Sequence, residues 1–492
     1  MKAWLVIPPV VVLFGAACIP GPADSSPPPG ALADGVVELA RSSEALDGLV
    51  LESLQESASD EISLTLAELD GQAGEVEFFL PAQTMTARLL GLEFLAGPDA
   101  WMVAGSMEVA GLDARASYSL AGGGSGECRL RVNVPLRDIH FQLEASPDTP
   151  SLDVGPAEVD GEQTGIELEP GCPLADLPVF TEQLTAAVAQ AGNLGAQQLA
   201  GRVAQALATV LGASGNWNGT VSAAWSASGW DGGLGYSISA GAASLWLGAQ
   251  AAGTRFTGGF WSQPSACLPA GTIDLPAQPL EPVDLDSLLA GQGQAVAALA
   301  VSDGFVAQAV VAAWRAGLFC RAPEAGACPG LQLEEWLPSA VSWAGRETRL
   351  LLATEAAPLV ELAGSNPQGA LPAVEVSWPE VRFDFYLDAA GADLRVLSLR
   401  ADLEMTVRPW LTTDGAGLTL EKVNLGRLEI EYSEPLLEAG GVLRQAAGQL
   451  VLQAVQQLAQ QLPPWPVSLP AGSGSLLAVR RQAGRSIIFL GP

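Results

Sequence analysis

One long apolar helix near the C-terminus constrains the fold more than any other feature of this sequence. Residues 436–462 carry aliphatic side chains at steps of three, four, seven and eight, which is the spacing of one face of an α-helix. Glutamines fill the opposite side, and within this stretch Arg444 is the only charged residue after Glu438. The prolines of residues 463–466 end the helix, because proline has no N–H to donate. A helix with so broad an apolar face has to lie along a large apolar concavity.

The order of the expected elements occurs twice. The first half begins with a helix over residues 32–57 and ends with a long helix over 179–211, interrupted near Gly192 and Gly195. Between these helices we expect short strands at residues 62–69, 75–80, 101–109, 115–120, 129–134 and 139–143. The second half has a helix over 302–318, further strands, the closing helix and one last strand over 476–490.

The clearest strand of the second half is predicted at residues 397–408. Apolar and polar residues alternate there over six cycles, the pattern of an antiparallel strand with one face in water. Residues 381–387 show the same alternation in the preceding strand. The sequence therefore predicts curved antiparallel sheets beside amphipathic helices.

A glycine-rich segment with five of the thirteen tryptophans, residues 212–282, joins the two halves. Two interpretations of these tryptophans remain open. They insert into a membrane interface, where amphipathic rings are favoured, or they fill a sheet that its glycines leave short of side-chain volume. The second interpretation is favoured.

The charge balance excludes several classes of partner. Acidic residues outnumber basic ones by 54 to 23, and Lys2 and Lys422 are the only lysines. A chain this acidic repels phosphate backbones and anionic headgroups, so we expect no nucleic-acid partner. At 492 residues, 49% of them hydrophobic, the chain can bury a large core.

The N-terminus predicts export. Residues 1–17 resemble a secretory signal peptide with one basic residue, an apolar run and small residues at its end. Cys18 follows at the position that a bacterial lipobox acylates, although Gly15 stands where that pattern prefers leucine. Residues 18–31 then form the lipidated cysteine and a flexible tether, and Ile19, rather than aspartate, favours the outer membrane. A plain signal peptide without acylation is the alternative.

The other five cysteines predict two disulfide bonds, because an odd number in an exported protein leaves one thiol over. Cys320 and Cys328 enclose a short loop of proline and glycine and form one predicted pair. Cys128 and Cys172 form the second, which joins a strand to the residues before a helix. Cys267 is then free.

The repeated order, together with three stretches, resembles the bactericidal/permeability-increasing and lipopolysaccharide-binding protein family of the tubular lipid-binding superfamily. Residues 298–319 look like the start of the family's second barrel, a strand that runs into a helix through Ser302 and Asp303. Residues 461–467 look like the break after its last helix, and residues 486–491 like its closing strand. The resemblance spans most of the mature chain.

This resemblance implies an α+β boomerang with pseudo-twofold symmetry: two antiparallel barrels, each wrapped on a long helix and joined by a central sheet. The corresponding divisions are an N-terminal barrel over 32–235, central-sheet strands and a Pro-rich connector over 236–290, and a C-terminal barrel over 291–492 whose last strand enters the central sheet. An acyl chain of about 14 methylenes would gain on the order of 11 kcal/mol between helix and barrel. The apolar residues expected to line that space are Leu39, Leu46, Leu49, Leu184, Val188, Leu199, Val203, Phe305, Val306, Val310, Leu443, Leu450, Val451, Val455 and Leu458.

The sequence offers little for catalysis. His140 is the single histidine and lies in the polar phase of a strand, so we expect it to face solvent, and no G-x-S-x-G motif accompanies it. The spacing of the cysteines suits no common metal site, and we predict no metal and no cofactor. The family's endotoxin-binding members use a cationic tip that this chain cannot assemble, so antibacterial activity is not carried over.

These observations predict a non-catalytic envelope lipoprotein that binds phospholipid or another acyl lipid and transfers or stores it. Two other hypotheses remain: an interaction or scaffold lipoprotein whose barrels are filled by their own side chains, and an envelope hydrolase. The sequence does not predict the oligomeric state.

Overall fold

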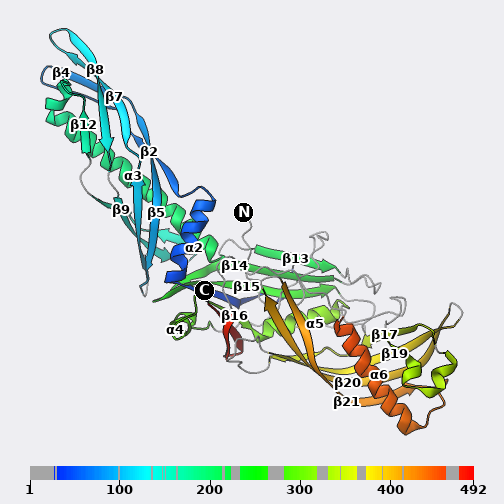
Figure 1. Ribbon diagram of the computed structural model, residues 1–492. Coiled ribbons are helices and arrows are strands. Elements are labelled where there is room, and N and C mark those ends of the chain that lie inside the picture. The colour runs from blue at the N-terminus through cyan, green and yellow to red at the C-terminus, as the bar shows by residue number, and fades with distance from the viewer. Residues whose placement is uncertain are drawn as a thin grey trace.

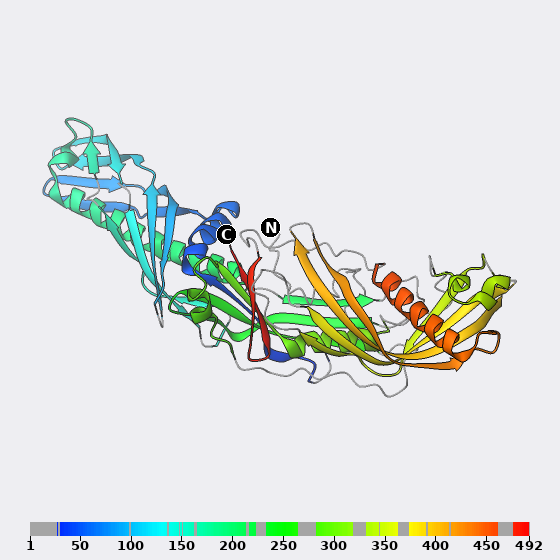
Figure 2. The same ribbon diagram turned by 60° about the horizontal axis from the view of Figure 1, so that its bottom comes forward.

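The computed structural model describes residue 27 and residues 30–97, 100–134, 137–146, 148–149, 151–161, 165–212, 216–222, 233–263, 282–317, 331–343, 345–362, 373–389, 392–412, 415–460 and 476–491. The molecule is elongated and bent, with one curled body at each end and a sheet between them (Figure 1). Figure 2 shows the same three parts after a turn of 60°.

The central sheet collects strands from the beginning, the middle and the end of the chain. Its seven antiparallel strands lie in the order β13 (Asn216–Ser222), β14 (Gly233–Leu247), β15 (Ala251–Gln263), β1 (Ala33–Ser42), β16 (Ala297–Ser302), β23 (Arg485–Leu490) and β22 (Leu476–Gln482). The short helix α4 (Leu285–Ala290) packs on one of its faces through Leu285 and Leu289. On the other face lies α5 (Asp303–Arg315), which brings Phe305 against the sheet.

Two antiparallel sheets enclose the N-terminal core. One contains β10 (Leu152–Val154), β9 (Arg137–Ala145), β6 (Trp101–Val109), β5 (Gln83–Leu95) and β2 (Glu61–Leu66), with β11 (Glu158–Gly161) also paired to β9. The other contains β12 (Gly165–Leu168), β8 (Gly124–Asn133), β7 (Leu112–Leu120), β4 (Val76–Leu80) and β3 (Leu69–Ala73). The long helix α3 (Pro178–Val210), preceded by the 3-10 turn η1 (Pro173–Asp176), runs along this body, and α2 (Ser43–Glu56) packs on α3 and β5 (Figure 1).

The C-terminal body has one strongly extended sheet. It contains β17 (Thr348–Thr354), β19 (Val374–Ala389), β20 (Ala392–Thr412) and β21 (Gly415–Tyr432), and β18 (Leu359–Leu362) also pairs with β19. The helix α6 (Gly440–Gln460) lies on β21, and two 3-10 segments, η3 (Leu333–Glu335) and η4 (Pro338–Trp343), complete the body. This sheet and α6 repeat the combination of curled sheet and long helix found in the N-terminal body.

The predicted fold class is confirmed. The chain is α+β, with two curled antiparallel sheet bodies, a long helix against each and a central sheet between them. The strand predicted at residues 397–408 lies within β20, and the predicted passage from strand to helix through Ser302 is correct. Ser302 caps α5, since its hydroxyl accepts a hydrogen bond from the Phe305 N–H at 3.2 Å.

The helix predicted over residues 32–57 is wrong in its first part, where the chain forms β1. The apolar positions of this stretch suit a helix as well as a strand that is buried on both faces, because such a strand is apolar throughout. β1 pairs with β15 on one side and β16 on the other, and cores cover both of its faces. The helix starts only after Ser42, whose side chain accepts from the Ala45 N–H at 3.4 Å.

The interruption predicted in the long helix near Gly192 and Gly195 is also wrong, because α3 is continuous through both residues. Gly195 has a packing role instead. A Cβ built on it would lie 2.0 Å from Leu64 Cδ2 and 3.0 Å from Ile62 Cδ1, so glycine allows α3 to lie directly on β2.

Both ends of the C-terminal prediction need correction. The closing helix begins at Gly440 rather than at Leu436. The single last strand is a hairpin of β22 and β23, which turns through Ala483 and Gly484 at φ values of 51° and 71°. The prolines expected to end the closing helix lie outside the described residues.

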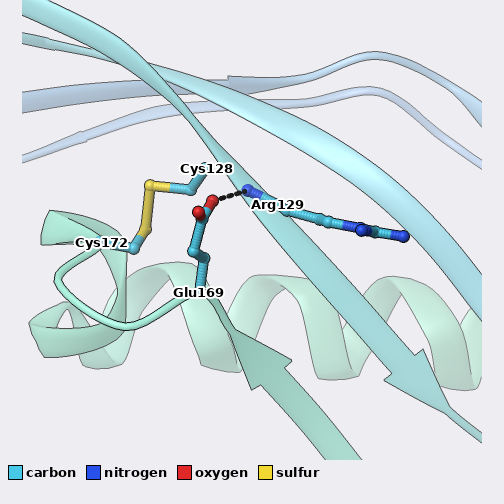
Figure 3. The surroundings of a disulfide bond; sticks show 4 residues. All are labelled: Cys128, Arg129, Glu169 and Cys172. Carbon is cyan, nitrogen blue, oxygen red and sulfur yellow. Dashed lines mark hydrogen bonds between the residues drawn. A yellow bond between two sulfur atoms is a disulfide. The ribbon is translucent and has the colours of Figure 1, made fainter.

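The predicted bond between Cys128 and Cys172 is present and has a Cα–Cα distance of 5.7 Å. It joins β8 to the residue that precedes η1 and α3, as Figure 3 shows. Beside it, the Glu169 carboxylate accepts a hydrogen bond from the Arg129 N–H at 3.3 Å. The disulfide therefore fastens the start of the long helix to the sheet. Cys18, Cys267, Cys320 and Cys328 lie outside the described residues.

Within the part of the chain that the structure describes, no helix is long and apolar enough to cross a membrane.

Candidate functional site

The predicted lipid-contacting residues of the N-terminal half lie in a densely packed core. Between 0% and 4% of the surface of Leu46, Leu184, Val188, Leu199 and Val203 is exposed, and all five pack in one cluster with both surrounding sheets. Leu49 is half-buried on α2. The long helix and the sheet also meet through aromatic rings, since the Phe78 and Phe180 centroids lie 5.2 Å apart.

The remaining predicted residues fall into two groups. Leu39 on β1 shares a cluster with Phe305 and Val306 of α5, whose Phe305 ring lies 4.8 Å from that of Phe260; Val310, also on α5, is buried as well. Leu443, Leu450 and Val451 lie on α6 and are buried in the core between this helix and the C-terminal sheet, and Val455 of the same helix is half-buried against that core. The Leu458 side chain lies outside the described part of the chain. The predicted set is thus divided among three cores.

A half-exposed apolar surface lies between two of these cores, on the inner face of the C-terminal sheet. Two registered rows of side chains cross that sheet: Val360, Val376, Met405 and Val423 in one, and Leu362, Val374, Val407 and Leu420 in the next. Leu362 and Val374 are buried, and the other six are half-buried. These six residues, Val360, Val376, Met405, Val407, Leu420 and Val423, are called the C-terminal strip below.

The strip borders both cores. Val360 and Val376 pack against the cluster that includes α5, whereas Met405 packs against the cluster beneath α6. Val407, Leu420 and Val423 belong to neither cluster. A surface of this kind leaves apolar area that no described core covers, and such area gains free energy when hydrocarbon is placed on it.

The opposite face of the same strands is charged. Arg408 on β20 forms an ion pair with Glu421 on β21, and their hydrogen bond holds the pKa of Glu421 below its ordinary value. Arg400 pairs with Glu431 at 2.8 Å farther along these strands. This separation of charge from apolar side chains follows from the period of two in a strand, and it leaves the strip as an uncharged surface.

Two tryptophans of the glycine-rich segment that joins the two halves, Trp246 and Trp261, lie over glycines of neighbouring strands. A Cβ on Gly235 would lie 2.3 Å from the Trp261 ring, and one on Gly253 would lie 2.5 Å from the Trp246 ring. Trp261 is 7% exposed. These two side chains therefore favour the interpretation that aromatic rings supply volume to a glycine-rich sheet.

His140 is half-buried on β9, between the buried residues Ile139 and Phe141. Its register partners are Ala104 and Glu158, neither of which is a nucleophile. Among the residues that the structure describes, no group of three or more His, Cys, Asp or Glu is arranged to hold a metal ion.

The candidate residues that sequence analysis missed are Val360, Val376, Val407, Leu420 and Val423. The alternation along β20 predicts that Met405 and Val407 share a face, but it does not predict that this face extends past the end of a core. The signal for β21 is weaker, because irregular register between β20 and β21 interrupts its alternation.

No protein-family model and no curated protein matches this chain. Among solved structures, a crystal structure of lipopolysaccharide binding protein matches at 13% identity with a TM-score of 0.44, covering 93% of this chain and 98% of that one. P47 of Clostridium botulinum E1 matches at 8% identity and a TM-score of 0.26, covering 94% and 99%. P47 of Clostridium botulinum A2 matches at 8% identity and 0.24, covering 93% and 97%. All three TM-scores are below 0.5, too low to carry an argument about function.

Proposed function

We propose that the protein binds an acyl lipid without catalysing a reaction, and that the hydrocarbon tail lies on the C-terminal strip. One observation carries this proposal: apolar side chains continue in register from β18 and β19 onto β20 and β21, where Val407, Leu420 and Val423 belong neither to the core at α5 nor to the core at α6. Such a surface provides apolar contact along its length and no charge, which is what a tail requires.

The energetics favour an extended chain over a compact ligand. Each methylene that leaves water for an apolar surface gains about 0.8 kcal/mol. A tail that lies along the strip covers Val407, Leu420 and Val423 together, whereas a small ligand covers only one of them. We therefore expect affinity to rise with chain length until the strip is filled.

The proposal extends to the cell envelope. Acylation of Cys18 would anchor the protein at the outer membrane, and residues 18–31 would tether the folded part to it. A lipid held on an exported, tethered protein can be stored or passed between membranes. These steps rest on the sequence of the N-terminus, which lies almost entirely outside the described residues.

The test uses adjacent residues that face opposite sides of β21. Val423→Trp places a bulky side chain on the strip, and Asn424→Trp places the same side chain on the exposed outer face. Uptake of a fluorescent fatty acid should fall about tenfold in Val423→Trp, because a loss of about 1.4 kcal/mol changes affinity tenfold, and should stay at the wild-type level in Asn424→Trp. Equal uptake by both variants and the wild type would remove the strip from the proposal.

A second candidate function, an interaction or scaffold lipoprotein, is favoured by the filled N-terminal core. Side chains of this chain already cover Leu184, Leu199 and Val203 completely. If both bodies were packed in this way, Val455→Trp on α6 would destabilise the protein by about 1–3 kcal/mol through overpacking. If α6 borders a space for lipid, the same substitution should leave stability within about 0.5 kcal/mol and reduce lipid uptake.

A further inference from the structure

A buried arginine lies on an apolar face of the central sheet. Arg41, near the end of β1, is 4% exposed. Two registered rows cross the sheet at this point, and residues opposite each other in antiparallel strands share a face. The rows are Leu247, Ala252, Arg41, Ala297, Leu490 and Leu476, and Leu245, Thr254, Leu39, Leu299, Ile488 and Val479. Arg41 is the only charged residue among these twelve.

Its guanidinium has no partner within the described chain. The Nε and Nη1 atoms are buried and make no hydrogen bond. The diagonal neighbour on the same face, Thr254, is 0% exposed, and its Oγ1 also lacks a partner. Burial lowers the pKa of Arg41 to about 10, so the group remains charged at neutral pH. Two adjacent residues thus present unused polar atoms in apolar surroundings.

The nearest acidic residue on β1 cannot neutralise this charge. Glu38 projects from the other face of the sheet, where it pairs with Arg255 at 3.1 Å and with Arg485 at 3.4 Å. Successive side chains of a strand point to opposite faces, so the backbone of the sheet separates Glu38 from Arg41. A buried charge without a counter-ion is strongly unfavourable, and none of the residues that the structure describes supplies a counter-ion for Arg41.

We propose that Arg41 and Thr254 bind the oxyanion head of an acyl ligand, and that the head is a carboxylate such as that of a fatty acid. A guanidinium offers a fork of N–H donors that matches the two oxygens of a carboxylate, and the Thr254 hydroxyl adds one donor. One unpaired positive charge calls for one negative charge. A zwitterionic headgroup would bring a second charge into an apolar site that has nothing to pair with it.

The surroundings favour an amphiphile over a free anion. A small hydrated anion loses its water on entering the site and gains no apolar contact, whereas an acyl chain gains free energy with each methylene that it buries. The residues beside Arg41 in both rows are aliphatic except for Thr254. This inference rests on the proposed lipid-binding function, and it adds a second position in the molecule, away from the C-terminal strip.

The experiment compares a charged and an uncharged ligand of equal chain length, oleate and methyl oleate, on delipidated full-length mature protein. The variants are Arg41→Met, which removes the charge, and Arg41→Lys, which retains it. The control is Arg115→Gln, which removes an equal charge from an exposed side chain on β7. All variants also carry Val423→Trp, so that the C-terminal strip is blocked. Binding is measured by displacement of an uncharged fluorescent acyl probe.

We expect Arg41→Met to weaken oleate binding about tenfold to a hundredfold, the usual effect of losing a hydrogen bond to a charged group, and to leave methyl oleate binding unchanged. Arg41→Lys should retain part of the preference for oleate, and Arg115→Gln all of it. Equal oleate affinity in Arg41→Met and its parent overturns the inference while lipid binding stands. If neither ligand binds even the wild-type protein, the proposed function itself fails.

Three further measurements separate the alternatives. Without ligand, Arg41→Met should be at least as stable as the wild type, because it removes an unpaired buried charge; a marked loss of stability would show that the chain itself pairs Arg41, against the inference. Oleate should raise the melting temperature of the wild type more than that of Arg41→Met. An equal rise with inorganic phosphate or acetate alone, dependent on Arg41, would mean a simple anion site and contradict an acyl ligand. Preference for phosphatidylglycerol over oleate would replace the carboxylate by a phosphodiester.

Discussion

Gly195→Ala tests how closely the long helix lies on the sheet. Alanine is about 1 kcal/mol better than glycine inside a helix, so a residue facing water would gain stability from this change. At Gly195 the new Cβ would lie 2.0 Å from Leu64 Cδ2. Leu64 and Ile62 are 3% and 2% exposed, and neither can move without displacing its neighbours. Overpacking of this kind costs about 1–3 kcal/mol, and we expect a net loss of about 1 kcal/mol.

The same helix contains its own control. Gly201 is exposed, and a Cβ there would meet nothing within 4 Å. Gly201→Ala should therefore stabilise the protein by up to about 1 kcal/mol, and the two variants should differ by about 2 kcal/mol. Urea denaturation followed by tryptophan fluorescence, to which the buried Trp101 of the same body contributes, measures both.

A third variant identifies the cause. Leu64→Ala alone should destabilise the protein by about 2–5 kcal/mol, but in combination with Gly195→Ala the loss should be smaller than the sum, because the new methyl group occupies part of the cavity. If Gly195→Ala is as stabilising as Gly201→Ala, α3 does not lie against β2 in the way described, and the packing argument fails.

Two other predictions concern the N-terminal body. Replacing both Cys128 and Cys172 by alanine should destabilise this body by about 4 kcal/mol, because the chain-entropy relation gives that value for cysteines separated by 44 residues. Reduction with dithiothreitol should cause the same loss of stability, and an unchanged denaturation midpoint would contradict a bridging role. Burial raises the pKa of Asp47 above its ordinary 3.8, while the hydrogen bond from the Phe94 N–H opposes this rise. Because the pKa of Asp47 is higher in the folded than in the unfolded protein, its contribution to stability is present below pH 3.8 and is lost as the pH rises through the folded pKa. The stability of Asp47→Asn should therefore equal that of the wild type in acid and exceed it at neutral pH. Parallel curves of stability against pH would refute this.

The sequence pattern correctly predicts those helices and strands whose burial follows one periodicity along their length. The alternation of β20 needs one wet face and one dry face, and the structure has both over residues 399–404, where Leu399, Ala401 and Leu403 are buried and the residues between them are half-buried or exposed. The predicted pair of Cys128 and Cys172 is correct because one cysteine lies in a recognisable strand and the other directly before a helical segment. The amphipathic face of α5 and the capping serine before it are likewise local features.

The errors arise where distant parts of the chain determine the structure. β1 is a strand because β15 and β16, more than 200 residues away, cover both its edges, and no local pattern contains that information. The same holds for Gly195, whose role depends on contact with β2. Arg41 is one of three charged residues in β1, with Asp34 and Glu38, so nothing local distinguishes it, and its lack of a partner follows only from the pairing of the central sheet.

The central claim, that hydrocarbon lies on the inner face of the C-terminal sheet between α5 and α6, is tested most directly by photolabelling. The full-length mature protein is loaded with a fatty acid that carries a diazirine at the middle of its chain, irradiated, digested and sequenced by mass spectrometry. We predict labelling of β20 and β21 at Met405, Val407, Leu420 or Val423, suppressed by excess unlabelled oleate and by Val423→Trp. Labelling spread over exposed surfaces, or none at the strip in protein that takes up the probe, would contradict the claim.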